Sequence, residues 1–210
     1  INALNEDLLS QFIPARPRLI GNRFFSHRPR RGTRDRWMLA ASAPTGPFSL
    51  SEEQKELIRG YVGKTPFAYK DRRFSLTLPA WRPFLPEDCV FVCVFRDPRR
   101  IAASVLKDVK SHPHLYDRLS IDLQASYANI VCLYDTILDQ HAVRGRWFFV
   151  HYDQLMSDRG VRRLGEFLEC DLNADFAEPR LKRAQPVKEM PAEAEKLYHR
   201  LCQLAQYDDS

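Results

Sequence analysis

The sequence lacks several features that would assign it to a class at once. No apolar run approaches the roughly 18 residues that a membrane-spanning helix needs. The opening segment INALNEDLL has neither the basic start nor the apolar stretch of a secretory signal. The five cysteines form no Cys-x-x-Cys pair and no metal-ligand spacing, and four of them lie in apolar stretches. We therefore expect a cytoplasmic protein with reduced cysteines, no membrane span and no metal site.

The size and charge of the chain limit the remaining classes. A length of 210 residues predicts one domain over 1–210, and 44% hydrophobic with 28% charged residues is typical of a globular protein. The net charge of +5 favours an anionic partner. Eight arginines and a single acidic residue, Asp35, lie between Arg16 and Arg36. Both a nucleic acid and a phosphate-rich small molecule would suit this charge.

The early part of the chain reads differently from the rest. A short helix is expected over residues 3–12, after which residues 13–50 are rich in proline, arginine and glycine. Such a composition predicts an irregular basic loop or lid. Ser51 then begins an amphipathic helix that ends near Gly63, with Ser51 as its N-cap.

Strands and helices alternate in the remaining sequence. The apolar runs at 90–95 (VFVCVF) and 147–152 (WFFVHY) predict strands buried on both faces, and PFAYK predicts a short strand at 66–70. The segment SLTLPAW predicts a helix or a turn broken by Pro79. Further helices are expected at 97–110, 121–141, 161–169 and 192–206. The order predicts an α/β fold with a mainly parallel central sheet flanked by helices.

Ligands of such folds bind beyond the carboxyl ends of the strands, which here are 70–73, 95–98 and 152–153. At 95–98, Asp97 is the expected N-cap of a helix and Pro98 its first residue. Helical spacing places Ser104 opposite the apolar face of this helix. Arg96, the Ser104 hydroxyl and free N–H groups at the helix start would together form a phosphate cradle. In the alternative interpretation Arg96 pairs with an aspartate at the sheet rim, Asp97 or Asp153, and Ser104 is merely solvated.

Four segments resemble PAPS-dependent sulfotransferases of bacterial type, where PAPS is 3′-phosphoadenosine 5′-phosphosulfate. RDPRRIAASVL resembles their 3′-phosphate segment, in which Arg-x-Pro opens the turn and a serine lies eight residues after the arginine, as Arg96, Pro98 and Ser104 do. YKDRRFSLTLPAW is similar to their Lys-Asp-Pro-Arg-Phe-x-Leu-Thr-Leu-Pro-x-Trp segment. VHYDQLMSDRGVRRLGEFL resembles their Tyr-Glu-Asp-Leu strand and helix, and LNEDLL their Leu-Asn-x-x-Leu-Leu.

The resemblance implies a three-layer, P-loop-like fold that uses PAPS and releases PAP, with no metal. It implies transfer of a sulfuryl group to a hydroxyl or amine of a carbohydrate, lipid or small natural product. Asp71 would be the general base and Lys70 would contact the sulfuryl group, although Arg72 stands where the family has proline. The alternative is that Lys70 and Asp71 only shape the end of the strand.

Further cofactor contacts follow from the same resemblance. Arg73 would meet a phosphate or an acceptor carboxylate, and Tyr152 would pack near the nucleotide, although an aromatic residue at a strand end also suits a structural role. Arg180 and Arg183 would cover the phosphates, or else belong to a solvated charged run.

One part of the family pattern has no counterpart here. The family begins with a strand and a loop rich in Arg, Ser, Gly and Thr that holds the phosphosulfate. The only Arg-Gly-Thr of this sequence, at 31–33, follows no apolar strand. We expect a sulfotransferase-like domain without this strand and loop. The alternatives are a basic nucleic-acid-binding domain, which the motifs do not support, and a nucleotide kinase-like protein, for which a Lys-Ser/Thr phosphate loop is absent.

Overall fold

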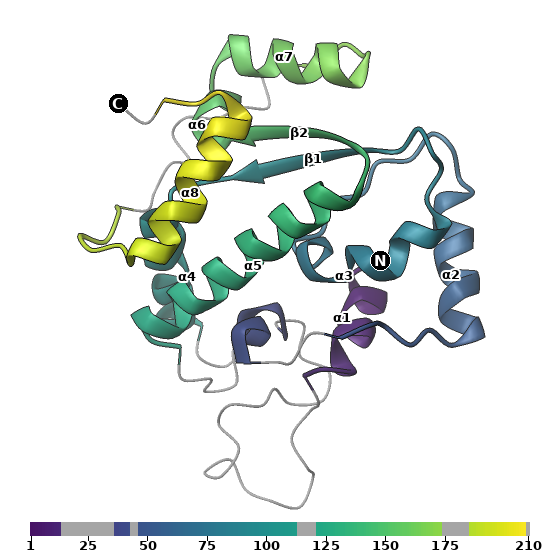
Figure 1. Ribbon diagram of the computed structural model, residues 1–210, viewed down its shortest axis with the longest axis horizontal. Helices are drawn as coiled ribbons and strands as arrows, with labels where there is room; N and C mark the ends of the chain where they lie inside the picture. The colour runs from purple at the N-terminus through teal and green to yellow at the C-terminus, as the bar shows by residue number, and fades with distance from the viewer. Residues whose placement is uncertain (14–35, 43–45, 113–120, 174–184, 209–210) are drawn as a thin grey trace, which may run out of the picture.

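The computed structural model describes residues 1–13, 36–42, 46–112, 121–173 and 185–208 (Figure 1). Among these residues, no helix combines the length and apolar composition that crossing a membrane requires. The elements follow one another in the order α1 (Asn2–Ser10), η1 (Arg36–Ser42), α2 (Glu52–Val62), α3 (Phe74–Trp81), η2 (Arg82–Phe84), β1 (Val90–Phe95), α4 (Pro98–Ser111), α5 (Leu123–Val143), β2 (Arg146–His151), α6 (Tyr152–Leu155), α7 (Asp158–Leu168) and α8 (Ala192–Ala205).

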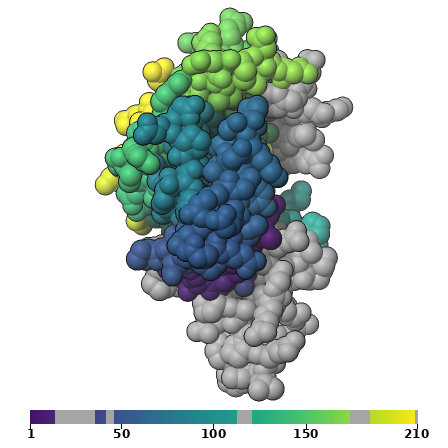
Figure 2. Space-filling model, turned by 90° about the vertical axis from the view of Figure 1, so that its right-hand side faces the viewer, coloured from purple at the N-terminus to yellow at the C-terminus, as the bar shows by residue number. Residues whose placement is uncertain are grey.

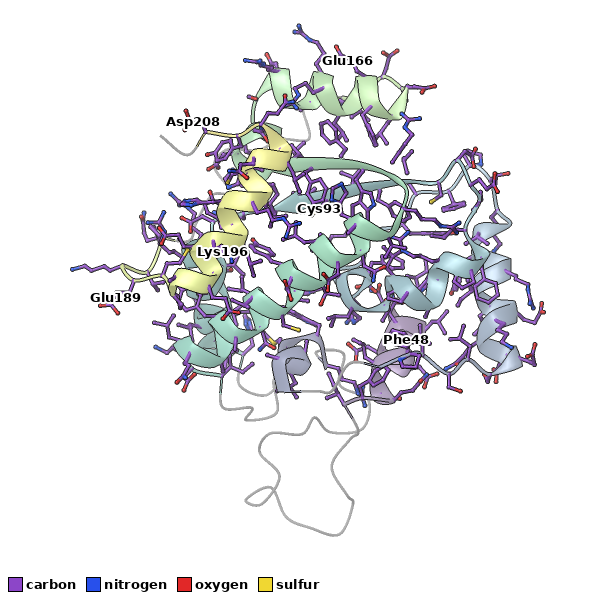
Figure 3. All side chains as sticks on the ribbon, viewed as in Figure 1. Phe48, Cys93, Glu166, Glu189, Lys196 and Asp208 are labelled. Atoms are coloured by element: carbon purple, nitrogen blue, oxygen red, sulfur yellow. The ribbon has the colours of Figure 1, made fainter. Side chains whose placement is uncertain are left out.

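The two strands form a parallel pair, as the apolar runs predict. Their register joins Val90 to Arg146 and Phe95 to His151, so the two carboxyl ends lie side by side. One face of the pair packs against α5 and α8, and Figure 3 shows Cys93 between β1 and these helices. Burial raises the pKa of the Cys93 thiol to about 12, which keeps this cysteine a neutral core residue. The chain is thus a mixed α/β protein with a small parallel sheet flanked by helices.

The expectation that both strands are buried on both faces is wrong for the other face of the sheet, which is partly exposed on β1. On β2, Phe148 packs on Phe167 of α7, with ring centroids 5.1 Å apart. On β1, Val92 and Val94 are 39% and 52% exposed. In the described part of the chain the sheet has only these two strands, and α7 contacts the second of them. A run of apolar residues predicts a strand but not how many layers of helices cover the sheet. The described residues do not form three complete layers.

A second core joins α1, α2 and α3. Leu8, Ile58 and Trp81 are almost wholly buried in it, and burying an apolar side chain of this size stabilises the fold by about 1.5–3 kcal/mol. Figure 2, viewed from the side of α2, shows that helix in blue across the surface of this half of the molecule. The N-cap prediction for α2 is confirmed, because Ser51 and Gln54 form a reciprocal capping box.

The predicted strand at 66–70 is wrong. Residues 67–70 join no strand ladder in the structure. Side-chain contacts hold the segment instead: the Phe67 and Tyr69 rings stack 5.3 Å apart, and the Tyr69 hydroxyl donates a hydrogen bond to the Tyr61 carbonyl. The next segment forms helix α3, which continues through Pro79 to Trp81 rather than breaking there.

The segment 13–50, expected to form an irregular basic loop or lid, contains the buried element η1. Trp37, Met38 and Ala40 of η1 are buried in a core with α4 and α5. Asn129 of α5 fixes this turn, since its side chain accepts a hydrogen bond from the Ala41 N–H and donates one to the Met38 carbonyl. Residues 14–35 and 43–45, and with them most of the arginine-rich stretch, lie outside the described residues.

Candidate functional site

Arg96 lies directly after β1, at the carboxyl end of the sheet. Its backbone is held from below by Tyr134 of α5: the Arg96 N–H donates to the Tyr134 hydroxyl over 3.3 Å, and that hydroxyl donates to the Arg96 carbonyl. Burial raises the pKa of Tyr134, so the hydroxyl stays protonated and able to donate. These two hydrogen bonds fix the backbone of Arg96, and with it the point from which the side chain extends.

The Arg96 guanidinium lies over the ring of Tyr152, 4.8 Å from its centroid. The parallel register explains this contact, because Tyr152 follows β2 just as Arg96 follows β1. The Nε and Nη2 atoms of Arg96 are buried and have no hydrogen-bond partner among the described residues. Buried polar groups in native proteins nearly always have partners, so these two N–H groups are oriented donors that an anion would satisfy.

The alternative in which Arg96 pairs with a nearby aspartate is not observed. Arg96 forms no ion pair with any described residue, and Asp97 instead binds Arg99, whose Nε lies 3.1 Å from each carboxylate oxygen. Asp97 also caps α4, as predicted, by accepting a hydrogen bond from the Arg99 backbone N–H.

The expectation of free N–H groups at the start of α4 is wrong for the same reason. Pro98 has no N–H, the Arg99 N–H bonds the Asp97 carboxylate, and the Arg100 N–H bonds the Asp97 carbonyl. Any anion at this turn would thus be bound by side chains, not by the helix terminus.

Ser104 is exposed on the outer side of α4, as helical spacing predicts. On the other sides of the helix, Ala102 is buried in the core beside the sheet with Ile101 packed against that core, and Val105 and Val109 pack against the cluster that includes Trp37 and Met38. With a rise of 1.5 Å per residue, Ser104 lies about 9 Å along the helix axis from Pro98. The structure thus brings Arg96 and Tyr152 into contact. Ser104 is accessible on α4, the helix that begins two residues after Arg96.

Asp71 and Arg73 lie in a buried ionic cluster with two residues that the sequence did not single out. Arg73 contacts Glu6 of α1 through Nε at 2.6 Å and Asp71 through Nη1 at 2.8 Å. The other carboxylate oxygen of Glu6 lies 3.1 Å from Nη1 of Arg36 in η1. Burial alone would lower the pKa of Arg73, but its hydrogen bonds to Glu6 and Asp71 raise it overall. The positive charges of two arginines and the negative charges of two carboxylates therefore balance one another inside the fold.

The carboxylate of Asp71 is turned inward. Its side chain is 2% exposed, and it accepts hydrogen bonds from Asn5 Nδ2 at 2.9 Å and from the Arg73 backbone N–H at 3.1 Å. The Asn5 oxygen in turn accepts from Thr77 and Trp81. Asp71 therefore holds the chain ahead of α3 in this structure. Its carboxylate does not face solvent as the expected general base would, because the segment is not a strand end.

The remaining predicted residues lie in three different surroundings. Lys70 is exposed beside Asp71. Arg73 is bound to carboxylates, so its guanidinium is not presented to a phosphate. Arg180 and Arg183 lie outside the described residues.

Sequence reasoning missed Asn5, Glu6 and Tyr134. A usable signal existed for Asn5, which lies four residues before Leu9 and thus on the apolar face of α1. A polar residue on a buried helix face needs partners.

We compared the chain with known protein families, curated proteins and solved structures, and none of them matches it.

Proposed function

We propose that this chain binds the 3′-phosphate of PAPS at the carboxyl ends of β1 and β2 and acts as a sulfotransferase. The observation that carries the proposal is the Arg96 guanidinium, which stacks on Tyr152 and has two buried N–H groups without a partner among the described residues. A planar guanidinium matches the oxygens of a phosphate with two parallel hydrogen bonds. The arrangement falls on the segment that resembles the 3′-phosphate motif of the family.

The other residues take the following roles in this proposal. Ser104 donates its hydroxyl to the same phosphate from α4, and Tyr152 keeps the guanidinium in plane. Lys70, exposed next to the buried cluster, is the cation available to a sulfuryl group. Asp71 and Arg73 act as positioning residues that fix the backbone from which Lys70 extends. When bound, PAPS would supply the activated sulfuryl group, and the acceptor would be a hydroxyl or amine of a carbohydrate, lipid or small natural product.

The proposal includes the three-layer, P-loop-like fold of the family. The support for it is the parallel strand pair with α5 and α8 on one face and the ligand-facing turn at the carboxyl ends. The exposed side chains of Val92 and Val94 leave room for further elements on the other face.

Thermal unfolding with added PAP tests the proposal. At a PAP concentration 100 times its Kd, binding should stabilise the fold by about 2.7 kcal/mol. For a chain of this size that corresponds to a rise in Tm of roughly 5–10 °C. Arg96→Ala should remove most of the shift because the phosphate loses its charged partner. Arg162→Ala, which deletes an exposed arginine of α7, should keep it.

Two results would count against the proposal. One is an unchanged Tm of the unsubstituted chain at millimolar PAP, and the other is an equal shift in the Arg96→Ala variant. Steeply salt-dependent binding of oligonucleotides without any response to PAP would favour the nucleic-acid alternative.

A further inference from the structure

His151 is a buried histidine at the end of β2, directly before Tyr152. It is 1% exposed, and the register of the sheet pairs it with Phe95, the residue before Arg96. Histidine is the side chain that ordinarily changes its charge between about pH 5 and 8. A titratable group thus lies one residue away from the contact between Arg96 and Tyr152.

The hydrogen bonds of the His151 ring define its protonation state. Nδ1 accepts a hydrogen bond from the Asp153 backbone N–H over 3.1 Å and thereby caps α6. A ring nitrogen that accepts carries no proton, so the proton of the neutral ring is on Nε2. Nε2 lies 3.3 Å from the hydroxyl of Tyr198 in α8, to which it donates. The structure therefore fits a neutral imidazole in one tautomer.

The same cap fixes the backbone on both sides of Tyr152. Before it, the His151 N–H donates to Gln154 Oε1 at 2.8 Å, and after it the Asp153 N–H donates to the His151 ring. The side-chain amide of Gln154 also donates to the carbonyl at the end of α8, at 3.1 Å. The Tyr152 ring, over which the Arg96 guanidinium lies, therefore extends from a backbone that the neutral imidazole helps to fix.

A proton on Nδ1 would abolish this cap, because an imidazolium has two donors and no acceptor. The Asp153 N–H would then face a second donor at 3.1 Å. The carboxylate of the same residue would attract the charged ring instead, since its Oδ2 lies 3.9 Å from Nδ1. This exchange of partners requires the first turn of α6 to rearrange, and Tyr152 is the first residue of that turn.

Charged and titratable groups come close to the ring from α6, from α8 and the residues after it, and from the end of β1. They are the Asp153 carboxylate, the Tyr198 hydroxyl with the exposed His199 beside it, Tyr207, whose ring stacks 4.0 Å from the imidazole, and Arg96. Tyrosine hydroxyls are ordinarily neutral below pH 8. Asp153 favours a positive charge on the imidazole and Arg96 opposes it, so the two act with opposite sign.

We infer that His151 is a positioning residue of the site at Arg96. The neutral ring keeps Tyr152 in contact with the Arg96 guanidinium, and protonation of the ring releases this contact. The coupling between the three residues does not depend on a ligand. Its consequence, a lower affinity for the 3′-phosphate as the pH falls, rests on the proposed function.

Nuclear magnetic resonance of the nucleotide-free chain between pH 8 and pH 5 tests the coupling. The ring signals of His151 should show the Nε2–H tautomer at pH 8 and the charged ring at pH 5. The side-chain Nε–H signal of Arg96 should shift with the same midpoint. His151→Asn keeps an oxygen that can cap α6 but does not titrate, so the Arg96 signal should stay constant in this variant. His199→Asn, which removes the neighbouring exposed ring, should leave the coupled shift unchanged.

Calorimetric titration with PAP at pH 7.5 and pH 5.5 measures the consequence for binding. The phosphates of PAP are themselves protonated with a pKa of about 6, which affects both proteins alike. From the higher to the lower pH, the affinity of the unsubstituted chain should fall about fivefold more than that of His151→Asn. The difference corresponds to the loss of one cation–π contact.

Several results would overturn the inference. They are a His151 ring that stays neutral down to pH 5, an Arg96 signal that does not follow the His151 midpoint, a coupled shift that persists in His151→Asn, and a PAP affinity that falls equally in both proteins. The first two require only the unsubstituted chain, so they decide the question even if the variant does not fold. A chain that shows the coupling but binds no PAP would refute the proposed function and leave the positioning role in place.

Discussion

Replacing Glu6 by alanine should lower the free energy of unfolding by about 3–5 kcal/mol, because it leaves buried arginines without their carboxylate. Glu6 contacts Arg36 and Arg73 through its two oxygens, and all three side chains are less than a tenth exposed. Arg73 would keep Asp71, and Arg36 would keep the hydrogen bond that its Nε donates to the Ile13 carbonyl, but both would lose the carboxylate that lies between them. Urea unfolding followed by circular dichroism measures the change.

A second glutamate provides the control. Glu56 pairs with Arg59 on the surface of α2, with 70% and 50% of the side chains exposed. Exposed pairs of this kind contribute little, so Glu56→Ala should stay within about 0.5 kcal/mol of the unsubstituted protein. If Glu6→Ala proved as mild as Glu56→Ala, the buried cluster would not be a major source of stability, and its position in the structure would need revision.

Gly160→Ala should lower the free energy of unfolding by about 3 kcal/mol or more. Gly160 lies in the first turn of α7 and faces the backbone of Gln154 in α6. A Cβ at this position would lie 1.9 Å from the Gln154 carbonyl oxygen and 2.5 Å from its carbon. Backbone atoms cannot turn away as a flexible side chain can, so α7 must shift from the sheet. Overpacking of this kind typically costs 1–3 kcal/mol, occasionally more.

The same substitution in α2 should have the opposite sign. A Cβ at Gly60 meets no atom within 4 Å, and the residue lies inside a regular helix. Alanine is favoured over glycine there by roughly 0.5–1 kcal/mol, so Gly60→Ala should raise stability. Thermal and urea unfolding of the two variants measure both changes. Equal effects at the two glycines would contradict the close packing of α6 against α7.

Local sequence signals were sufficient for most of the helices and for the two apolar strands. Asp97 followed by Pro98 predicts the start of α4, and the structure places that start there. The segment at 66–70 had similar strand character, but a strand needs a neighbouring strand. Phe67 and Tyr69 instead stack on each other, and Tyr69 also packs on Tyr61. Whether a run finds such a neighbour depends on the whole fold.

The candidate site shows the same limit. The contact between Arg96 and Tyr152 follows from two neighbouring strands whose carboxyl ends are in register. The sequence predicts parallel strands, but their order and register are seen only in the structure. The burial of Asp71 could not be predicted in this way. It depends on Asn5 and on Arg73, and Arg73 is bound to a glutamate 67 residues earlier in the chain. Partners so distant in sequence leave no spacing from which to infer them.

The most direct test of the central claim compares two nucleotides on two proteins. Adenosine 3′,5′-bisphosphate and adenosine 5′-phosphate differ only in the 3′-phosphate, and Arg96→Ala removes the guanidinium proposed to bind it. A hydrogen bond to a charged group contributes about 1.5–3 kcal/mol, so the unsubstituted protein should prefer the bisphosphate roughly 10- to 150-fold. The variant should bind both nucleotides with nearly equal affinity. If Arg96→Ala instead weakened both by the same factor, Arg96 would not contact the 3′-phosphate, and the account of this site would be wrong.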